Sequence, residues 1–197
     1  MADFIYYLID IVNNMGYIGI LIVVGLEYAC FPVSSEILLP FIGYCVYMGE
    51  MSILGAIVAS TGGAVLGCSA CYAVGRFGRN VLDKVLLSRF ASLKEGIEKA
   101  DTFFHKAGRQ SVFFGRFIPL VRTYISFPVG MIKMKYSSFL LYSFAGALLW
   151  NSLLISIGYF LGEHWETFSS FMKTNTSIIL LICLIIVLLF SFIKNQK

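Results

Sequence analysis

The segment FPVSSEILLP, residues 31–40, places a glutamate between two prolines inside one of the most apolar parts of the chain. Proline removes a backbone donor and clashes with the preceding helical turn, so Pro32 and Pro40 are expected to break a helix on both sides of Glu36. A charged side chain at membrane depth costs about 2.5 to 3.5 kcal/mol unless it is paired or faces water. The segment therefore predicts an interrupted helix whose acid meets a partner from elsewhere in the chain.

The composition indicates that this chain folds in a membrane. Of its 197 residues, 58% are hydrophobic and 13% are charged, and the mean hydropathy is +0.83. These values predict an integral membrane protein of one domain, with no nucleic acid as a partner. The N-terminal MADFIYYLID has no Lys or Arg before its apolar residues, so a cleaved signal peptide is not expected.

Five cysteines lie almost wholly in apolar segments, where they behave as small hydrophobic residues. Cys68 and Cys71 form a CxxC pair within GGAVLGCSACYAVG, which favours close helix packing over redox or metal chemistry. A metal site would need further ligands, and the two histidines, His105 and His164, are expected on opposite sides of the membrane. The sequence predicts no disulfide framework, no metal site and no cofactor.

Three apolar stretches are long enough to cross a bilayer without interruption, namely residues 52–74, 137–161 and 175–193. Two others, residues 16–48 and 112–132, contain prolines and charged residues near their middle. Neither of these two reads as a straight helix.

The distribution of basic residues predicts the orientation. Residues 76–110 contain eight Lys or Arg and show apolar residues three and four apart, which predicts a cytoplasmic amphipathic helix on the inner leaflet. Lys194 and Lys197 place the C-terminus on the same side. Both ends of 112–132 are then cytoplasmic and both ends of 16–48 lie outside, so each stretch is expected to enter the membrane and return as a re-entrant hairpin. Irregular backbone at this depth must be covered by protein, which predicts that the hairpin tips meet.

An internal repeat supports this plan. At an offset of 87 residues, four pairs of residues match at equivalent points of a hairpin followed by a helix: Pro32 with Pro119, Gly43 with Gly130, Tyr72 with Tyr159, and Gly75 with Gly162. The predicted fold is an all-α polytopic membrane protein with an inverted repeat, two opposed re-entrant hairpins, about three full transmembrane helices and one cytoplasmic amphipathic helix.

The second hairpin contributes two arginines, in GRFIPLVRTYISFPVG, where Arg116 and Arg122 flank Pro119. Together with Glu36 they form a predicted buried charge cluster, in which one acid leaves one arginine over. An arginine fork is shaped to hold carboxylate or phosphate oxygens, so the surplus charge indicates an anionic ligand. If Glu27 also lies nearby and is ionised, the surplus vanishes, and protonation of a glutamate would then switch the charge of the site.

FPVSSEILLP and FFGRFIPLVRTYISFPVG, separated by a basic loop, resemble the DedA family of bacterial membrane proteins, in the SNARE-associated/VTT superfamily. The resemblance covers roughly residues 16–162. It implies a multi-pass protein of the bacterial cytoplasmic membrane that translocates lipids, either undecaprenyl phosphate or a phospholipid such as phosphatidylethanolamine. Other members are similar to proton-dependent transporters.

The resemblance also implies roles for single residues. Glu36 and the paired arginines match the family's essential acidic and basic positions, as substrate-binding groups, and Glu27 matches an acid that precedes them. A further family acid has Met48 at its expected spacing, while Glu50 follows two residues later. Glu36, Glu27 and Glu50 are therefore the candidates for proton coupling.

Several functions stay open at this point. A polyprenyl phosphate is the favoured substrate, because only its small phosphate head needs a polar path. The alternatives are a phosphatidylethanolamine translocase, a proton- or cation-coupled transporter of a small solute, a structural scaffold and, as an enzyme, a membrane lipid phosphatase. No catalytic residue is predicted, since no histidine lies in the hairpins. A homo-oligomer is among the partners left open.

Overall fold

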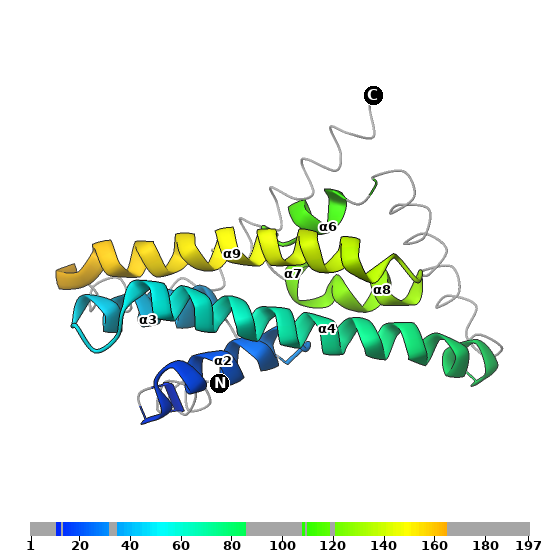
Figure 1. The fold of residues 1–197 in the computed structure, drawn as a ribbon, viewed down its shortest axis with the longest axis horizontal. Coiled ribbons are helices and arrows are strands. Elements are labelled where there is room, and N and C mark those ends of the chain that lie inside the picture. Colours follow the sequence, from blue (N-terminus) through cyan, green and yellow to red (C-terminus); the bar gives the residue numbers. More distant parts are fainter. Residues whose placement is uncertain are drawn as a thin grey trace.

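The computed structural model describes residues 11–12, 14–31, 35–85, 108, 110–118 and 121–164, with the backbone alone for 79–85. Regular structure in this part of the chain is entirely helical, which confirms the all-α prediction. Figure 1 shows two long helices, α4 and α9, running side by side with the shorter helices packed against them.

The first interrupted stretch forms two short helices, α2 (Tyr17–Tyr28) and α3 (Ser35–Tyr47). The chain turns sharply after α2, where Cys30 adopts the left-handed conformation with φ at +74°. The expected second break at Pro40 is wrong, because α3 continues through this residue. Pro40 packs its backbone directly on Gly158 of α9, and a neighbouring helix at this distance allows a proline to stay inside a membrane helix.

The second interrupted stretch is more broken than the first. It comprises α6 (Gln110–Gly115), α7 (Val121–Tyr124) and α8 (Ser126–Met131). After α6 the chain leaves helical geometry, and the single turn of α7 is separated from α8 by Ile125.

The two long helices are α4 (Ile53–Val85) and α9 (Tyr136–Leu161), the latter followed by the short 3-10 helix η1 (Gly162–His164). Within the described residues they supply two segments that are long and apolar enough to cross a membrane, Ile53–Gly78 and Tyr136–His164. With 33 residues at about 1.5 Å each, α4 is roughly 50 Å long and extends well beyond the roughly 30 Å apolar core of a bilayer. The segment expected as a separate loop from residue 76 therefore begins as part of α4.

Two predicted segments are not tested by this structure. The amphipathic part of 76–110 beyond residue 85 and the apolar stretch 175–193 lie outside the described residues.

One helix of each broken segment packs on the long helix of the other half of the chain, whereas α2 packs on α4 and α6 on α9, within their own halves. Helix α3 lies along α9, and α8 lies along α4, toward opposite ends of the long pair (Figure 1). Backbone contacts at glycine make both pairings close. A side chain at Gly43 would collide with the backbone of Ile155 and Tyr159, and one at Gly130 with the backbone of Tyr72 and Arg76.

Glycines on the long helices lie equally close to the backbone of the broken segments. A side chain at Gly158 would collide with Pro40, and one at Gly75 with Phe127. Small residues at these positions let the helix backbones approach closely, which is the usual basis of helix association in a membrane. The broken segments are thus held firmly enough to position side chains between them.

Candidate functional site

A buried ion pair joins the two broken segments. Glu27, in the last turn of α2, is 1% exposed, and Arg122, in α7, is 2% exposed. The Arg122 Nη2 group donates a hydrogen bond to Glu27 Oε1, and the Ser35 hydroxyl, at the start of α3, donates to the same oxygen. The break after α2 and the break before α7 therefore meet through opposite charges, 95 residues apart in the chain.

Glu36 is a second, more open partner of the same arginine. Its Oε1 lies 3.5 Å from Arg122 Nη2, and its side chain is 28% exposed. The sequence predicted Glu36 as the acid that meets the arginines, but the structure places Glu27 closer to Arg122 and deeper. Glu36 stands at the accessible edge of the cluster.

Arg116 is held in a different way. It is fully buried, and its guanidinium donates to the carbonyl of Arg122 at 2.6 Å and to the hydroxyls of Ser126 and Ser143 at 2.9 and 2.8 Å. In the described part of the chain it forms no ion pair. These bonds tie the loop before α7, helix α8 and helix α9 together, so Arg116 fixes the position of Arg122.

Gly146 explains how Arg116 reaches this position. A side chain at Gly146 would collide with the Cβ and Cγ atoms of Arg116. Without one, the stem of the arginine lies directly on α9.

Aromatic rings enclose both arginines. The guanidinium carbons of Arg116 and Arg122 lie 5.4 and 5.8 Å from the ring centroid of Tyr28. Phe139 lies 5.9 Å from Arg116, and Trp150 lies 5.3 Å from Arg122. At these distances the faces of the rings stabilise positive charge, which helps to keep two arginines ionised away from water.

Several buried polar atoms of the site have no hydrogen-bond partner among the described residues. They are the Nε and Nη1 atoms of Arg122, the Nε atom of Arg116, the Oε2 atom of Glu27, the Tyr28 hydroxyl, the Trp150 Nε1 atom and the side-chain amide of Asn151. Buried polar groups are nearly always satisfied, so a group of unfilled donors around one arginine indicates a place for an oxygen-rich anion.

The contribution of α9 to the site was not predicted from the sequence. Ser143 and Asn151 lie eight residues apart on the buried face of this otherwise apolar helix. Polar residues on one face of a membrane helix are the signal that would have identified them, because such groups face the protein interior.

A family model described as the VTT domain matches residues 31–160, which include α3, α4, the second broken segment and nearly all of α9, whereas α2 precedes the matched range. The chain belongs to the VTT-domain family. It is a membrane protein of that family, whose members include the DedA proteins that the sequence resembles.

Three relatives of this VTT-domain chain carry informative names. An alkaline phosphatase-like protein of Lactococcus lactis (strain IL1403) is 37% identical over 96% of this chain and 91% of its own length. Undecaprenyl phosphate transporter A of Bacillus subtilis (strain 168) is 31% identical over 100% of this chain and 97% of its own length. Protein DedA of Escherichia coli (strain K12) is 35% identical over 50% of this chain and 45% of its own length. No solved structure is a significant match.

Within this VTT domain, Glu50 lies away from the arginines. It is exposed and sits in the turn between α3 and α4. The length of α3, at about 1.5 Å per residue, places this turn roughly 20 Å from the first turn of α3, which carries Glu36. The structure thus brings Glu27, Glu36, Arg116 and Arg122 together and leaves Glu50 out.

The cysteines of the CxxC pair face different neighbours. Cys68 donates to the carbonyl of Val65, whereas the Cys71 sulfur lies 3.1 Å from that of Cys30. Across the residues that the structure describes, no three His, Cys, Asp or Glu side chains gather in a way that could hold a metal ion.

Proposed function

We propose that this VTT-domain protein is a lipid translocase that moves undecaprenyl phosphate across the bacterial cytoplasmic membrane for reuse of the carrier lipid. The observation that carries the proposal is the buried Arg122, which keeps two unfilled donors at the meeting point of two broken helical segments. Two relatives named undecaprenyl phosphate transporter A, at 31% and 28% identity, support the choice of substrate.

Binding of the lipid would exchange one ion pair for another. The phosphate head group binds Arg122 and displaces Glu36, the more distant and more exposed of its two acids. Arg116 positions Arg122 by donating from Nη1 to the main-chain carbonyl of Arg122, and both N–H groups of its Nη2 are taken by Ser126 and Ser143. The polyprenyl tail stays in the lipid, so the site encloses the head group alone.

Release of the head group requires the acids to return. Glu27 already contacts Arg122, and a proton on Glu27 would remove the competing negative charge and favour the phosphate. Loss of that proton would favour release. Proton movement could drive the transport cycle through this exchange. Glu27 would gain and lose the proton, and Glu36 would leave Arg122 when the phosphate binds and return when it departs.

The proposed architecture is an inverted repeat with two re-entrant hairpins, with the 76–110 segment and the C-terminus in the cytoplasm. The glycine contacts support this repeat. A contact in one half becomes a contact in the other half when residues of the short helices are shifted by 87 positions and residues of the long helices by 83. Gly43 on Ile155 and Tyr159 then corresponds to Gly130 on Tyr72 and Arg76. The alignment of the long helices differs by four residues, about one helical turn, from the offset of 87.

Hydrolysis of a lipid phosphate is the second candidate, because one relative is named an alkaline phosphatase-like protein. The arginine cluster offers binding groups and one hydroxyl beside a carboxylate, because Ser35 donates to Glu27. The same Glu27 oxygen also accepts from Arg122, which makes this carboxylate a weak base, and Ser126 and Ser143 both accept from Arg116. Release of inorganic phosphate from undecaprenyl phosphate by the purified protein would establish this activity and reject the translocase.

Lipid binding to purified protein in nanodiscs tests the proposal. Wild type should bind undecaprenyl phosphate in preference to phosphatidylethanolamine, and Arg122→Gln should lose this binding while retaining its helical circular dichroism. Preference for phosphatidylethanolamine would identify the protein as a phospholipid translocase. Equal and weak binding of both lipids, unchanged in Arg122→Gln, would reject a lipid substrate and favour a transporter of a small solute.

A further inference from the structure

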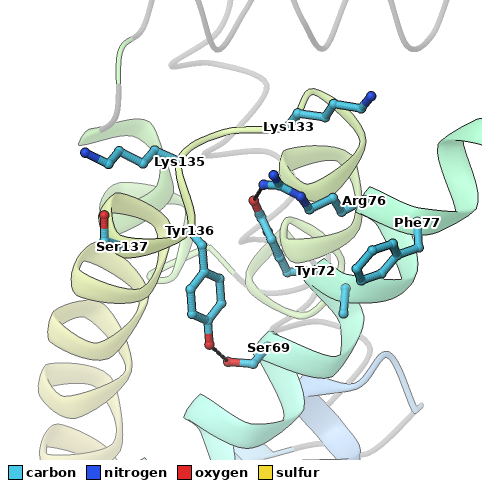
Figure 2. A pocket seen from close by; sticks show the side chains of 9 residues that line it. Ser69, Tyr72, Arg76, Phe77, Lys133, Lys135, Tyr136 and Ser137 are labelled. Carbon is cyan, nitrogen blue, oxygen red and sulfur yellow. Dashed lines mark hydrogen bonds between the residues drawn. The ribbon is translucent and has the colours of Figure 1, made fainter.

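A pocket lined by basic and aromatic side chains lies outside the arginine cluster, where the later part of α4 faces the connection between α8 and α9. Its volume is about 660 Å³. Figure 2 shows its side chains, which come from α4 on one side and from the start of α9 on the other. The residues that line it are Ser69, Tyr72, Ala73, Arg76, Phe77, Lys133, Lys135, Tyr136 and Ser137.

All charged residues that line this pocket are basic. Arg76, Lys133 and Lys135 line it, and none of its lining residues is acidic. Figure 2 shows the Arg76 guanidinium beside Tyr72, with the side chains of Lys133 and Lys135 extending outward in opposite directions. Three cations around one concavity favour an anion, and basic pockets between membrane helices are a known form of lipid head-group recognition.

Hydrogen bonds of two tyrosine hydroxyls hold side chains of the pocket in place. Arg76 Nη1 donates to the Tyr72 hydroxyl at 2.8 Å, and that hydroxyl in turn donates to the carbonyl of Met134. Tyr136 donates to Ser69 at 3.0 Å, which joins the start of α9 to α4. The guanidinium is thus preorganised at the centre of the pocket, with its remaining donors available for a ligand.

Two exposed aromatic side chains also line the pocket. Phe77 is 73% exposed and Tyr136 is 43% exposed. Both lie at the ends of segments that are apolar enough to cross a membrane, Ile53–Gly78 and Tyr136–His164. An anion bound between the cations would therefore have lipid-facing aromatic surface beside it, which suits a head group that remains attached to its tail better than a free soluble ion.

A ladder of aromatic contacts links this pocket to the buried arginines. The Arg76 guanidinium lies 6.0 Å from the Tyr72 ring centroid. Tyr72 stacks on Phe139 with ring centroids 4.7 Å apart, and Arg116 lies over the other ring of this stack at 5.9 Å. The two cationic sites are therefore connected by packed side chains of α4 and α9.

We infer that this pocket, the Arg76 pocket, is a second anion site that holds the phosphate head group of a lipid at one end of the path through Arg122. The inference rests on the proposed function for the identity of the lipid. In the proposed topology the Arg76 pocket lies at the cytoplasmic end of α4. It retains the head group there, before entry to the buried site or after departure from it.

Binding stoichiometry tests this inference. Native mass spectrometry of the full chain should detect two undecaprenyl phosphate molecules per wild-type protein. The double variant Lys133→Asn, Lys135→Gln should lose one of them, and Arg122→Gln should lose the other. Asparagine suits position 133, where the backbone φ is +55°. We expect about thirtyfold weaker binding in the pocket, equivalent to about 2 kcal/mol for two lysines.

A matched variant keeps the charge. Lys133→Arg, Lys135→Arg should retain both lipids, and loss of one in this variant would overturn the inference. Retention of both lipids after neutralisation of the two lysines would also overturn it. An excess of inorganic phosphate should not displace the lipid from the Arg76 pocket, and complete displacement would identify a soluble anion as its ligand instead.

The test separates this inference from the proposed function. If undecaprenyl phosphate binds only in the Arg76 pocket and Arg122→Gln changes nothing, the proposed transport site fails while the second site stands. If binding depends on Arg122 alone, the second site fails while the transport site stands.

Discussion

Glu27→Gln should tighten the binding of an anionic head group and slow transport at the same time. Glutamine keeps the shape of the side chain and an oxygen that can accept from Ser35 and Arg122. It removes the negative charge that competes with a phosphate for Arg122. The expected sign is unusual, because the loss of a charged residue in a binding site normally weakens binding.

The magnitude follows from the geometry. Two opposite charges about 4 Å apart attract each other by roughly 4 kcal/mol at the effective dielectric constant of protein sites. Glu36 remains 3.5 Å from Arg122 and retains part of the competition, and the glutamine dipole retains some more. We therefore expect about half of that energy, about 2 kcal/mol, to appear as tighter binding, which is about thirtyfold in Kd.

The assay is equilibrium binding of undecaprenyl phosphate to purified protein in nanodiscs, with the rate of lipid release measured in parallel. Glu50→Gln is the matched control, because it removes the same charge from the exposed turn between α3 and α4. This control should leave Kd within twofold of wild type. Weaker binding by Glu27→Gln, or an equal change in Glu50→Gln, would refute the exchange of glutamate for phosphate at Arg122.

Three further results are expected. Gly63→Ala should lower the melting temperature of the protein, because the new side chain would collide with the backbone of Leu21 and Gly25. The neighbouring Gly62→Ala should be neutral or slightly stabilising, since only a Leu21 methyl approaches within 4 Å there. Equal effects of the two substitutions would contradict the packing of α2 on α4. Mild oxidation with oxidised glutathione should form a disulfide between Cys30 and Cys71, whose sulfurs lie 3.1 Å apart. Peptide mapping should detect this disulfide, and Cys30→Ser should abolish it. If both thiols stay intact under conditions that oxidise an engineered pair of surface cysteines, the position of the first break beside α4 is contradicted. Ser143→Ala should lower the free energy of unfolding by about 1.5 to 3 kcal/mol, because it removes a hydrogen bond to the charged Arg116. Ser156→Ala on the same helix is the control. Equal stability of the two variants would argue that Arg116 does not hold the second broken segment in place.

The general plan of the fold could be predicted from residue patterns. Apolar length predicted the two long helices, and the start of α9 falls within one residue of its expected position. Proline and charge within apolar stretches predicted that 16–48 and 112–132 are not straight helices. The outcome at Pro40 differed because a proline breaks a helix only where no neighbour compensates, and the contact with Gly158 is a tertiary feature that no local pattern contains.

The candidate site was predicted in its residue types but not in its pairing. Charge balance indicated that the arginines need acids, yet it could not decide whether Glu27 or Glu36 lies nearer to Arg122. That choice depends on the direction in which the chain turns at Cys30. Satisfaction of Arg116 by hydroxyls and a carbonyl was equally hidden, because it requires Gly146 to bring α9 into contact with the arginine stem.

Translocation of undecaprenyl phosphate in proteoliposomes would show whether the protein moves this lipid and whether the movement depends on Arg122. The lipid is placed in one leaflet, and its appearance in the other is followed by the access of a membrane-impermeant phosphatase to its head group. Wild type should move the head group across the bilayer, and folded Arg122→Gln should move it no faster than protein-free liposomes. Transport by Arg122→Gln at the wild-type rate, or no transport by wild type, would contradict the account.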